Sequence, residues 1–392
     1  MKILHISDYF DLEVPGGSTS LIEAHLIELA RRGHEPALLA GHPGEPPPEL
    51  SAGIPRFAFR YPANGSSGLL RSVAQLRSQW RQRLDQAAPN LVVFHQPLSA
   101  NALLDLVDSA GIPIIYMFHS PWPREHMIGR RGRIAHLGAS LRQSLEGRAL
   151  RRAFRVTTES RYMQDEARRL YGLGLGRMAI IPGGVDLDRF RPSANRVELR
   201  KRLGVPPGLL IFTLRRLVPR MGVERLVEAV ASLSDKPRPV QLWIGGTGPE
   251  ETKLRNLAEK RGKGRVRFLG HVPEADAPNL YAAADLCVVP SIDLEGFGLA
   301  TLESLACGTP VLATPVGANP EILRDLDVDL LLTSTDSDAI AKGIDAGRNG
   351  RWDDPTLRER CRSHAAARYA WGSAVSLFEA LASDVTRLFA AP

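Results

Sequence analysis

The sequence predicts an α/β fold of two domains, each with a parallel sheet covered by helices on both faces. Short apolar runs alternate with amphipathic helical stretches, and a second series of these alternations begins at Leu210. Strands that alternate with helices in this way form parallel sheets. The length of 392 residues is enough for two domains of ordinary size. We expect a first domain over 1–186, a second over 187–370, and a last helix over 371–392 that packs back on the first.

The first domain begins with an apolar strand over 3–6, a loop ending in Gly16 and Gly17, and a helix over 21–30. Glycines between a first strand and its helix allow close backbone approach at the carboxyl edge of a parallel sheet, where such folds bind ligands. Later strands are expected at 35–40, 91–95, 113–119 and 155–158, and helices at 69–84 and 134–154.

Two of these strands end in a histidine. His95 closes the run Leu91-Val-Val-Phe, and His119 closes the run Ile114-Ile-Tyr-Met-Phe. Parallel pairing places both at the carboxyl edge of the sheet. From the sequence alone His95 is interpreted as a core or edge residue.

The second domain repeats the alternation. Its helices include stretches over 223–233 and 250–260, and the amphipathic helix over 371–389 ends the chain. Its strands are expected at 210–214, 240–244, 266–269, 286–289 and 310–313, with a weaker one at 330–332.

Composition is that of a globular protein, with 44% hydrophobic and 24% charged residues. No apolar run reaches the roughly 18 residues that a membrane span needs. The start of the chain is interpreted as a strand and not as a signal peptide. The three cysteines have no metal-type spacing, so we expect a reducing cytoplasm.

The positive charge is concentrated in one segment. Residues 124–155 contain nine arginines and two glutamates, a net charge of +7 that equals the net charge of the whole chain. Such a segment indicates an anionic partner or a solvated helix face. We predict peripheral contact with an anionic membrane at its inner face, with a phosphorylated acceptor as the alternative. Aromatic residues are not interleaved with the arginines, so no nucleic-acid partner is expected.

The stretch from Glu295 to Glu303 follows an apolar strand and contains two carboxylates at i and i+8. On a helix these lie about 12 Å apart along the axis. Hydrolytic carboxylate pairs stand about 5 to 9.5 Å apart, so a hydrolysis site is excluded. The spacing suits a ligand with hydroxyls at both ends and an anion between them, held by helix amides. A nucleotide sugar has this form.

An ordered set of motifs resembles glycosyltransferase family 4, a family of retaining sugar-nucleotide enzymes. The resemblance covers nearly the whole chain and implies two Rossmann-like domains, doubly wound, that face each other across a cleft (GT-B). The motifs are Gly16-Gly17, His119, Pro182-Gly-Gly-Val-Asp186, Arg216, Gly245-Gly-Thr-Gly-Pro249, Phe268-Leu-Gly-His-Val272, and the Glu295/Glu303 pair with Ala306-Cys-Gly-Thr-Pro310.

The resemblance implies roles for single residues. Glu295, His119 and Arg216 are the expected catalytic residues: Glu295 contacts sugar hydroxyls, His119 lies near the donor sugar through its carbonyl or ring, and Arg216 neutralises the diphosphate. Glu303 binds the ribose and Val272 lies where the base is read. The other donor-binding residues are Gly16, Gly17, Arg220, Phe297, Gly298, Leu299 and Ala300.

One position departs from the family pattern. The family has a lysine five residues after the arginine, and here Met221 occupies that place. A thioether cannot neutralise a phosphate. Arg220 is the expected replacement, and Arg215 is a further candidate. This departure raises the alternative of a catalytically weakened protein that binds sugar nucleotides.

The implied reaction is a front-face displacement that uses no protein nucleophile, metal or resident cofactor. The sequence does not fix the base of the donor, and a UDP-sugar is the co-substrate we expect. The acceptor is a carbohydrate, a lipid-linked glycan or a small glycoside. A pyridoxal phosphorylase is disfavoured because the second-domain motifs lack a lysine, and a nicotinamide oxidoreductase because Gly245-Gly-Thr-Gly-Pro249 lacks the third glycine.

Overall fold

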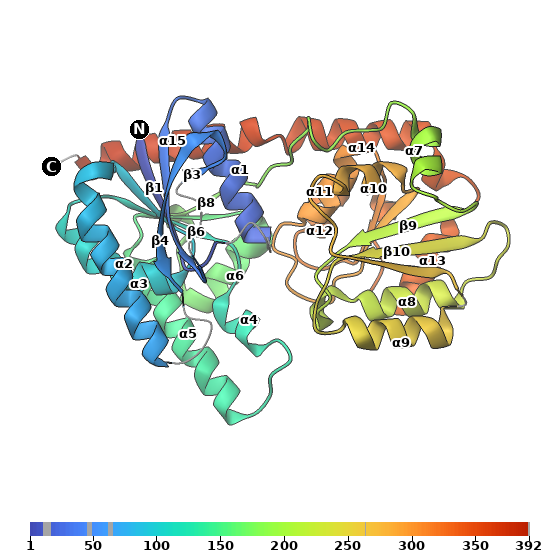
Figure 1. Ribbon diagram of the computed structural model, residues 1–392, viewed down its shortest axis with the longest axis horizontal. Helices are drawn as coiled ribbons and strands as arrows, with labels where there is room; N and C mark the ends of the chain where they lie inside the picture. The colour runs from blue at the N-terminus through green and yellow to red at the C-terminus, as the bar shows by residue number, and fades with distance from the viewer. Residues whose placement is uncertain (11–16, 45–48, 62–65, 263, 391–392) are drawn as a thin grey trace. The chain divides into compact units, whose positions relative to one another are not determined.

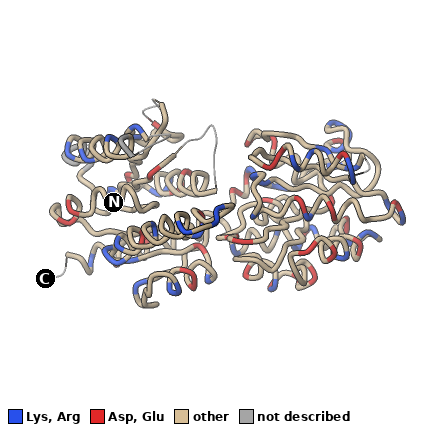
Figure 2. The backbone as a smooth tube through the Cα atoms, turned by 90° about the horizontal axis from the view of Figure 1, so that it is seen from below, with Lys and Arg blue, Asp and Glu red and all other residues tan. Residues whose placement is uncertain are grey.

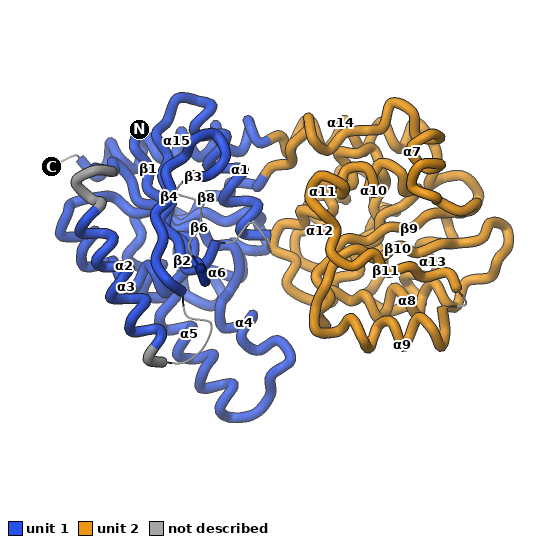
Figure 3. Tube along the Cα trace, in the orientation of Figure 1, with its two compact units in different colours: residues 1–183, 371–392 blue, residues 184–370 orange. Residues whose placement is uncertain are grey.

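The computed structural model describes residues 1–10, 17–44, 49–61, 66–262 and 264–390 (Figure 1). The chain divides into two compact units (Figure 3). Unit 1 comprises Met1–Gly183 and Trp371–Pro392, and unit 2 comprises Gly184–Ala370. The division therefore falls three residues before the expected boundary.

Unit 1 contains an eight-stranded sheet in the order β3-β4-β2-β1-β5-β6-β7-β8. All neighbours pair in parallel except β3 and β4, which are antiparallel. The strands are β1 (Lys2–Ser7), β2 (Glu35–His42), β3 (Glu49–Leu50), β4 (Ile54–Arg60), β5 (Leu91–Phe94), β6 (Ile114–Phe118), β7 (Arg155–Thr158) and β8 (Met178–Ile180).

Helices cover both faces of this sheet. On one face α1 (Gly17–Arg31) packs beside α15 (Trp371–Ala390), and Leu29, Val375 and Phe378 form a core with Ile3 and Val93 of the strands. Arg32 binds the carbonyl of Gly372 and the carboxylate of Glu379, so the last helix is tied to the first. The other face carries α2 (Ser66–Ala87), α3 (Pro97–Ser109), α4 (Trp122–Met127), α5 (Arg133–Arg152) and α6 (Arg161–Tyr171).

Unit 2 contains a five-stranded parallel sheet in the order β11-β10-β9-β12-β13. Helices α8, α9 and α13 pack together, as do α7, α10, α11 and α14, which gives the sheet two helical layers. The strands are β9 (Leu209–Leu214), β10 (Val240–Gly245), β11 (Val266–Gly270), β12 (Leu286–Val289) and β13 (Val311–Ala313). The helices are α7 (Arg196–Arg202), α8 (Val223–Ser232), α9 (Glu251–Arg261), α10 (Ala277–Ala283), α11 (Leu299–Ala306), α12 (Asn319–Leu323), α13 (Ser337–Ala346) and α14 (Pro355–Arg368).

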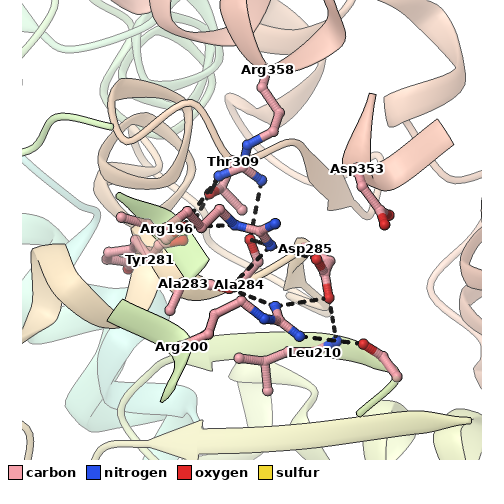
Figure 4. A network of polar contacts seen from close by, with 12 residues as sticks. Arg196, Arg200, Leu210, Tyr281, Ala283, Ala284, Asp285, Thr309, Asp353 and Arg358 are labelled. Atoms are coloured by element: carbon pink, nitrogen blue, oxygen red, sulfur yellow. Dashed lines mark hydrogen bonds and ion pairs between the residues drawn. The ribbon is translucent and has the colours of Figure 1, made fainter. Parts of the chain in front are cut away.

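A buried carboxylate fixes the amino ends of the central strands of unit 2. Asp285, directly before β12, is 1% exposed and accepts a hydrogen bond of 2.7 Å from the amide of Leu210 in β9. Arg196 and Arg200 form ion pairs with it (Figure 4). Arg238 also lies 3.5 Å from its carboxylate. A charge taken out of water needs this compensation, so the network holds β12 in register beside β9.

Several elements differ from the sequence-based expectation. The strand expected at 330–332 is wrong: 3₁₀ residues Val328–Leu330 precede a single bridge between Leu331 and Ala313. No bounds are predicted from the sequence for strands β3, β4 and β8 or for helices α3, α6, α13 and α14. None of the described helices has the length and apolar character that a membrane span requires.

Both signs of charge occur throughout each unit (Figure 2). Many form ion pairs along one helix, as Arg255 does with Glu251. Such pairs contribute about 0.3 to 0.5 kcal/mol each, and they leave little uncompensated charge where they occur.

Candidate functional site

The order in which strands are added to the unit 2 sheet reverses at its centre, between β9 and β12. Strands β9 and β12 are hydrogen-bonded neighbours, although β10 and β11 come between them in sequence. Ligands of parallel α/β sheets bind outside the carboxyl ends of the strands at such a point. Arg215 and Arg216 follow β9 here, and the loop Pro290 to Gly298 follows β12.

Arg215 and Glu295 form a buried ion pair at this point. They are 7% and 8% exposed, and the Nη2 of Arg215 contacts an oxygen of Glu295 directly. Ser291 joins both: its hydroxyl accepts from Arg215 at 2.7 Å and donates to Glu295. Burial alone would raise the pKa of Glu295, but Arg215 and Ser291 together hold it below the ordinary value. Glu295 is therefore an ionised acceptor of hydrogen bonds.

The backbone around the pair is held by close contacts with two glycines. A Cβ at Gly246 would lie 1.9 Å from the carbonyl oxygen of Arg215, and one at Gly317 would lie 1.9 Å from the carbonyl oxygen of Glu295. Both glycines have positive φ, which other residues rarely adopt. Leu294, with φ 52°, places a strained residue directly before Glu295.

The neighbouring cations differ from one another. Arg216 is exposed, and its side chain has no hydrogen bond or ion pair within the described part of the chain. Arg220 instead donates to the carbonyl of Leu294 at 2.9 Å. The sulfur of Met221 lies 2.9 Å from the Nη2 of Arg215. Arg215 is therefore committed to the interior of the site, whereas Arg216 can neutralise a ligand. The predicted roles of Arg216 and Arg220 remain predictions.

Helix α11 begins at the end of this loop. Gly298, with φ 88°, precedes it, and Phe297 is buried against Tyr369 with ring centroids 6.1 Å apart. The amides of Leu299 and Ala300 have no acceptor among the described residues. Free amides and the helix dipole together make this end a site for an anion.

Glu303 lies further along α11 on a partly buried position. Burial raises the pKa of its carboxyl to about 7, opposed by Tyr281 and the charge of Arg189. The Tyr281 hydroxyl is buried and has no hydrogen-bond partner among the described residues. Val272 follows β11 and lies so near Gly245 that a Cβ on that glycine would be 2.7 Å from its Cγ2. The ribose and base roles of Glu303 and Val272 also remain predictions.

Unit 1 carries a row of three histidines and a glutamate that are hydrogen-bonded across four neighbouring strands. The Nδ1 of His5 in β1 lies 2.9 Å from the Nε2 of His95 after β5, and the Nδ1 of His95 lies 2.9 Å from the Nε2 of His119 after β6. The Nδ1 of His119 contacts Glu159 after β7. The ring centroids are 5.2 Å apart in both steps, close to the spacing of about 4.8 Å between strands.

The row has one consistent arrangement of protons when the rings are neutral. The Glu159 carboxylate accepts from the Nδ1–H of His119. The Nε2 of His119 then accepts from the Nδ1–H of His95. The Nε2 of His95 in turn accepts from the Nδ1–H of His5. Burial lowers the pKa of His5 and His95 well below the ordinary value, and neighbouring histidines lower it further. Both ring nitrogens of His119 are therefore occupied, which leaves its carbonyl and ring C–H groups to contact a ligand.

A small pocket adjoins this row. It is lined by residues of α1, the start of α15 and the strand ends, including Ile22, His25, His119 and Trp371. His25 is buried, and neither of its ring nitrogens has a hydrogen-bond partner among the described residues. Gly17 is the first residue of α1 and is exposed. Gly16, also predicted to bind the donor, lies outside the described residues.

In unit 1 the strand order reverses between β1 and β5. At the carboxyl ends of these two strands, side chains of the protein itself occupy the hydrogen-bonding groups. Asp8 accepts from the amides of Leu98 and Ser99 at the start of α3, at 3.0 and 2.6 Å. Gln96 accepts from the Ser7 hydroxyl and from the amide of Asp8, both at 2.7 Å. The anion site of α3 is therefore occupied by a carboxylate of the protein itself.

Sequence reasoning missed several of these residues. His95 was interpreted as a core or edge residue, and the structure makes it the central link between His5 and His119. The sequence contained a sign of this row. Strands β1, β5, β6 and β7 are neighbours in the sheet, and each contains or is closely followed by a histidine or a glutamate. Arg215 was considered only as a cation for phosphate, and its bond to Glu295 was not foreseen.

Two family descriptions match the chain. Residues 195–368 match "Glycosyl transferases group 1", and residues 15–189 match "Glycosyltransferase Family 4". A phosphatidyl-myo-inositol mannosyltransferase of Mycobacterium leprae is 30% identical over 385 residues, which are 96% of this chain and 95% of that protein. A GDP-mannose-dependent α-(1-6)-phosphatidylinositol monomannoside mannosyltransferase of Mycolicibacterium smegmatis is 34% identical over 197 residues, 48% of this chain and 51% of that protein.

Solved structures agree over the whole chain. Sucrose-phosphate synthase from Thermosynechococcus elongatus has a TM-score of 0.83 at 21% identity and covers 99% of this chain and 100% of that one. Anabaena HepE in complex with UDP has a TM-score of 0.78 at 21% identity, with 98% and 100% covered. At this identity the likeness shows the fold alone, and it confirms the predicted α/β class with two Rossmann-like domains.

We predict opposite effects for two adjacent arginines. Arg215→Ala leaves Glu295 buried without its partner, so the free energy of unfolding should fall by about 3 to 5 kcal/mol. Arg216→Ala removes an exposed side chain that has no partner among the described residues, so it should change stability by less than about 0.5 kcal/mol. It should nevertheless weaken nucleoside-diphosphate binding about tenfold or more, because a charge-assisted hydrogen bond contributes about 1.5 to 3 kcal/mol. Chemical denaturation and calorimetric titration measure the two effects, and equal stability loss in both variants would contradict the assignment.

His25→Phe should make unit 1 less sensitive to acid. Burial lowers the pKa of His25 to about 3, so stability that is present above the ordinary value of 6.5 is lost as pH falls toward about 3. Each histidine kept neutral in this way lowers the free energy of unfolding by about 1.4 kcal/mol for every pH unit between 6.5 and its lowered pKa. A phenylalanine removes one such group and can keep the edge contact with Phe378. The slope of melting temperature between about pH 6 and pH 4 should be smaller in the variant, and an unchanged slope would disprove the account.

Proposed function

This chain belongs to the glycosyl transferases group 1 of glycosyltransferase family 4, and we propose that it is a retaining, metal-independent enzyme. It is a glycosyltransferase that uses a nucleotide sugar. In the proposed step the bond from C1 of the sugar to the diphosphate oxygen breaks, with its electrons going to that oxygen. The acceptor hydroxyl bonds to C1 on the same face, and its proton passes to the leaving phosphate oxygen.

The observation that carries the proposal is the group formed by the buried Arg215–Glu295 pair, the exposed Arg216 and the free amides of α11. The amides of Leu299 and Ala300 and the charge of Arg216 would stabilise the diphosphate as it leaves. Glu295 is kept ionised by Arg215, so it would accept hydrogen bonds from sugar hydroxyls and would not donate a proton. This arrangement favours transfer by front-face displacement over general-acid hydrolysis.

The remaining roles rest on the resemblance. Glu303 would accept the ribose hydroxyls, and Val272 would lie beside the base. From unit 1, Gly17 would contact the diphosphate through its backbone. His119 would contact the sugar through its carbonyl or a ring C–H, because its two ring nitrogens already bond to His95 and Glu159.

For the donor we propose mannose carried by GDP. A relative that spans nearly the whole chain is named a mannosyltransferase, and another relative is named GDP-mannose-dependent. The UDP-sugar expected from the sequence is the second candidate, since the HepE structure that contains UDP is only 21% identical to this chain. For the acceptor we propose the inositol headgroup of a phospholipid, following the names of the same relatives.

The function is tested by incubating the enzyme with GDP-mannose or UDP-glucose and phosphatidylinositol vesicles, with product detected by mass spectrometry. We expect a mannosylated lipid with retained anomeric configuration, and the same rate with a metal chelator present. Glu295→Gln should lower kcat by about 10²- to 10³-fold, the usual effect of removing one oriented electrostatic group. Inverted product, or full activity in both Glu295→Gln and Glu303→Ala, would refute the proposal.

Glu303 should make nucleotide binding depend on pH. Because the pKa of its carboxyl lies at about 7, the ionised acceptor is lost as the solution is acidified below that value. If only the carboxylate binds the ribose, GDP affinity should rise about tenfold from about pH 6 to about pH 8. Glu303→Gln should bind more weakly and show a flat profile. Calorimetric titration at several pH values measures this, and a slope retained in Glu303→Gln would assign the titration to another group.

The unliganded protein should show the opposite trend. A pKa raised above 4.5 in the folded state contributes stability that is present below 4.5 and is lost as pH rises through about 7. Above that pH Glu303→Gln should therefore gain stability relative to the natural chain. Denaturation at matched pH values separates this effect on folding from the effect on binding.

A further inference from the structure

The corner between α4 and α5 carries an exposed apolar stripe that the proposed reaction does not use. Ile134, Leu137 and Leu141 are 90%, 73% and 60% exposed. At 3.6 residues per turn these three positions lie within about 60° of one another on α5. In Figure 1 the first half of α5 and the loop that joins it to α4 extend from the lower edge of unit 1. Isolated apolar residues on a surface are ordinary, but a contiguous stripe on one helix face indicates a partner.

Arginines without a carboxylate partner in the described ranges border this stripe. Arg130, Arg131 and Arg142 line a shallow hollow between α4 and α5 together with His126. Within the described part of the chain none of the three arginines forms an ion pair, and Arg142 instead lies 5.0 Å over the ring of Trp122. Burial lowers the pKa of Arg142, and the nearby charge of Arg130 lowers it further. A cluster of like charges of this kind is stabilised by a bound anion.

The acidic residues of the same segment do not neutralise these arginines. Glu146 is 2% exposed on the inner face of α5, where it accepts from the amide of Trp122 at 2.9 Å and from the hydroxyl of Tyr171. Gly138 leaves room for the hollow, since a Cβ there would lie 2.8 Å from the Nε2 of His126. Three of the nine arginines of 124–155 thus lie at the hollow beside the apolar stripe, whereas Arg124 and Arg152 pair with Glu166 and Asp108 elsewhere.

We infer that this corner is a docking surface for an anionic phospholipid bilayer. Ile134, Leu137 and Leu141 enter the boundary between headgroups and acyl chains, and Arg130, Arg131 and Arg142 bind lipid phosphates. A stripe of aliphatic residues flanked by arginines is the pattern of helices that lie in the membrane interface. A nucleic-acid surface would present aromatic side chains for stacking, and the exposed large apolar residues here are aliphatic. The inference goes beyond the proposed reaction, because docking needs neither donor nor turnover.

Co-sedimentation of the full chain with vesicles tests this surface. Vesicles of phosphatidylcholine with phosphatidylglycerol should bind the protein, and vesicles of phosphatidylcholine alone should bind it at least tenfold more weakly. Binding to the anionic vesicles should weaken from about 0.1 M to about 1 M salt, as screening shortens from about 10 Å to about 3 Å. Ile134→Ser/Leu137→Ser/Leu141→Ser should lower affinity at least tenfold. Arg130→Gln/Arg131→Gln should lower it about 25-fold, since each basic residue near an anionic surface contributes about 1 kcal/mol.

Matched controls change equal features elsewhere. Leu377→Ser/Leu388→Ser removes exposed leucines of α15, which are 51% and 48% exposed, and should bind like the natural chain. Lys201→Gln/Arg202→Gln removes the same charge from exposed positions on α7 and should also bind normally. Far-ultraviolet circular dichroism shows whether each variant is folded.

Binding that does not distinguish anionic from neutral vesicles would overturn the inference, as would equal loss in the controls. A chain that stays in the supernatant with every vesicle would also overturn it, whether or not it transfers mannose to a soluble inositol phosphate. Conversely, vesicle binding without any transfer activity would refute the proposed function and leave the docking surface intact.

Discussion

The buried ion pair between Arg215 and Glu295 is the constraint on which the unit 2 site depends. It joins the chain after β9 to the loop after β12, where the strand order reverses. Removing either partner would leave an unpaired charge in the interior, which is strongly destabilising. The ion pair therefore fixes the position of the two segments relative to each other. Asp285 and its arginines do the same at the opposite ends of these strands. Strand β12 is thus held at its amino end by Asp285, and the loop after it is held by Glu295. These contacts fix the start of α11 and its free amides.

The two units use their strand ends differently. In unit 2 the carboxyl edge carries full charges, with Arg216 and the amides of α11 uncompensated among the described residues. In unit 1 the edge carries hydrogen-bonded rings from His5 to His119, closed by Glu159. Asp8 fills the anion site that α3 would offer. The carboxyl edge of unit 2 thus offers positive charge and free amides among the described residues, whereas that of unit 1 offers hydrogen-bonded rings.

The fold class and most strands were predictable because parallel strands are continuous apolar runs that alternate with helices. The error at 330–332 has a physical reason: the run is apolar because its leucines are buried, but only one bridge forms. Strand β4 was missed because polar residues interrupt its apolar pattern. Glu303 lies on α11 as expected, but Glu295 lies in the loop before that helix, so the helical spacing assumed for the pair does not apply. The partner of Glu295 could not be predicted, because Arg215 is distant in sequence and identical in type to its exposed neighbour Arg216.

The buried Arg215 limits which residues can occupy position 221, where this chain has a methionine. Its sulfur lies 2.9 Å from the guanidinium of Arg215, so a lysine at that position would place an ammonium against a cation that is already buried. The two positions are therefore epistatic: the effect of a residue at 221 depends on the residue at 215. A chain that keeps Arg215 and gains a lysine at 221 would hold two positive charges side by side in the site, so the lysine is tolerated best where residue 215 is uncharged.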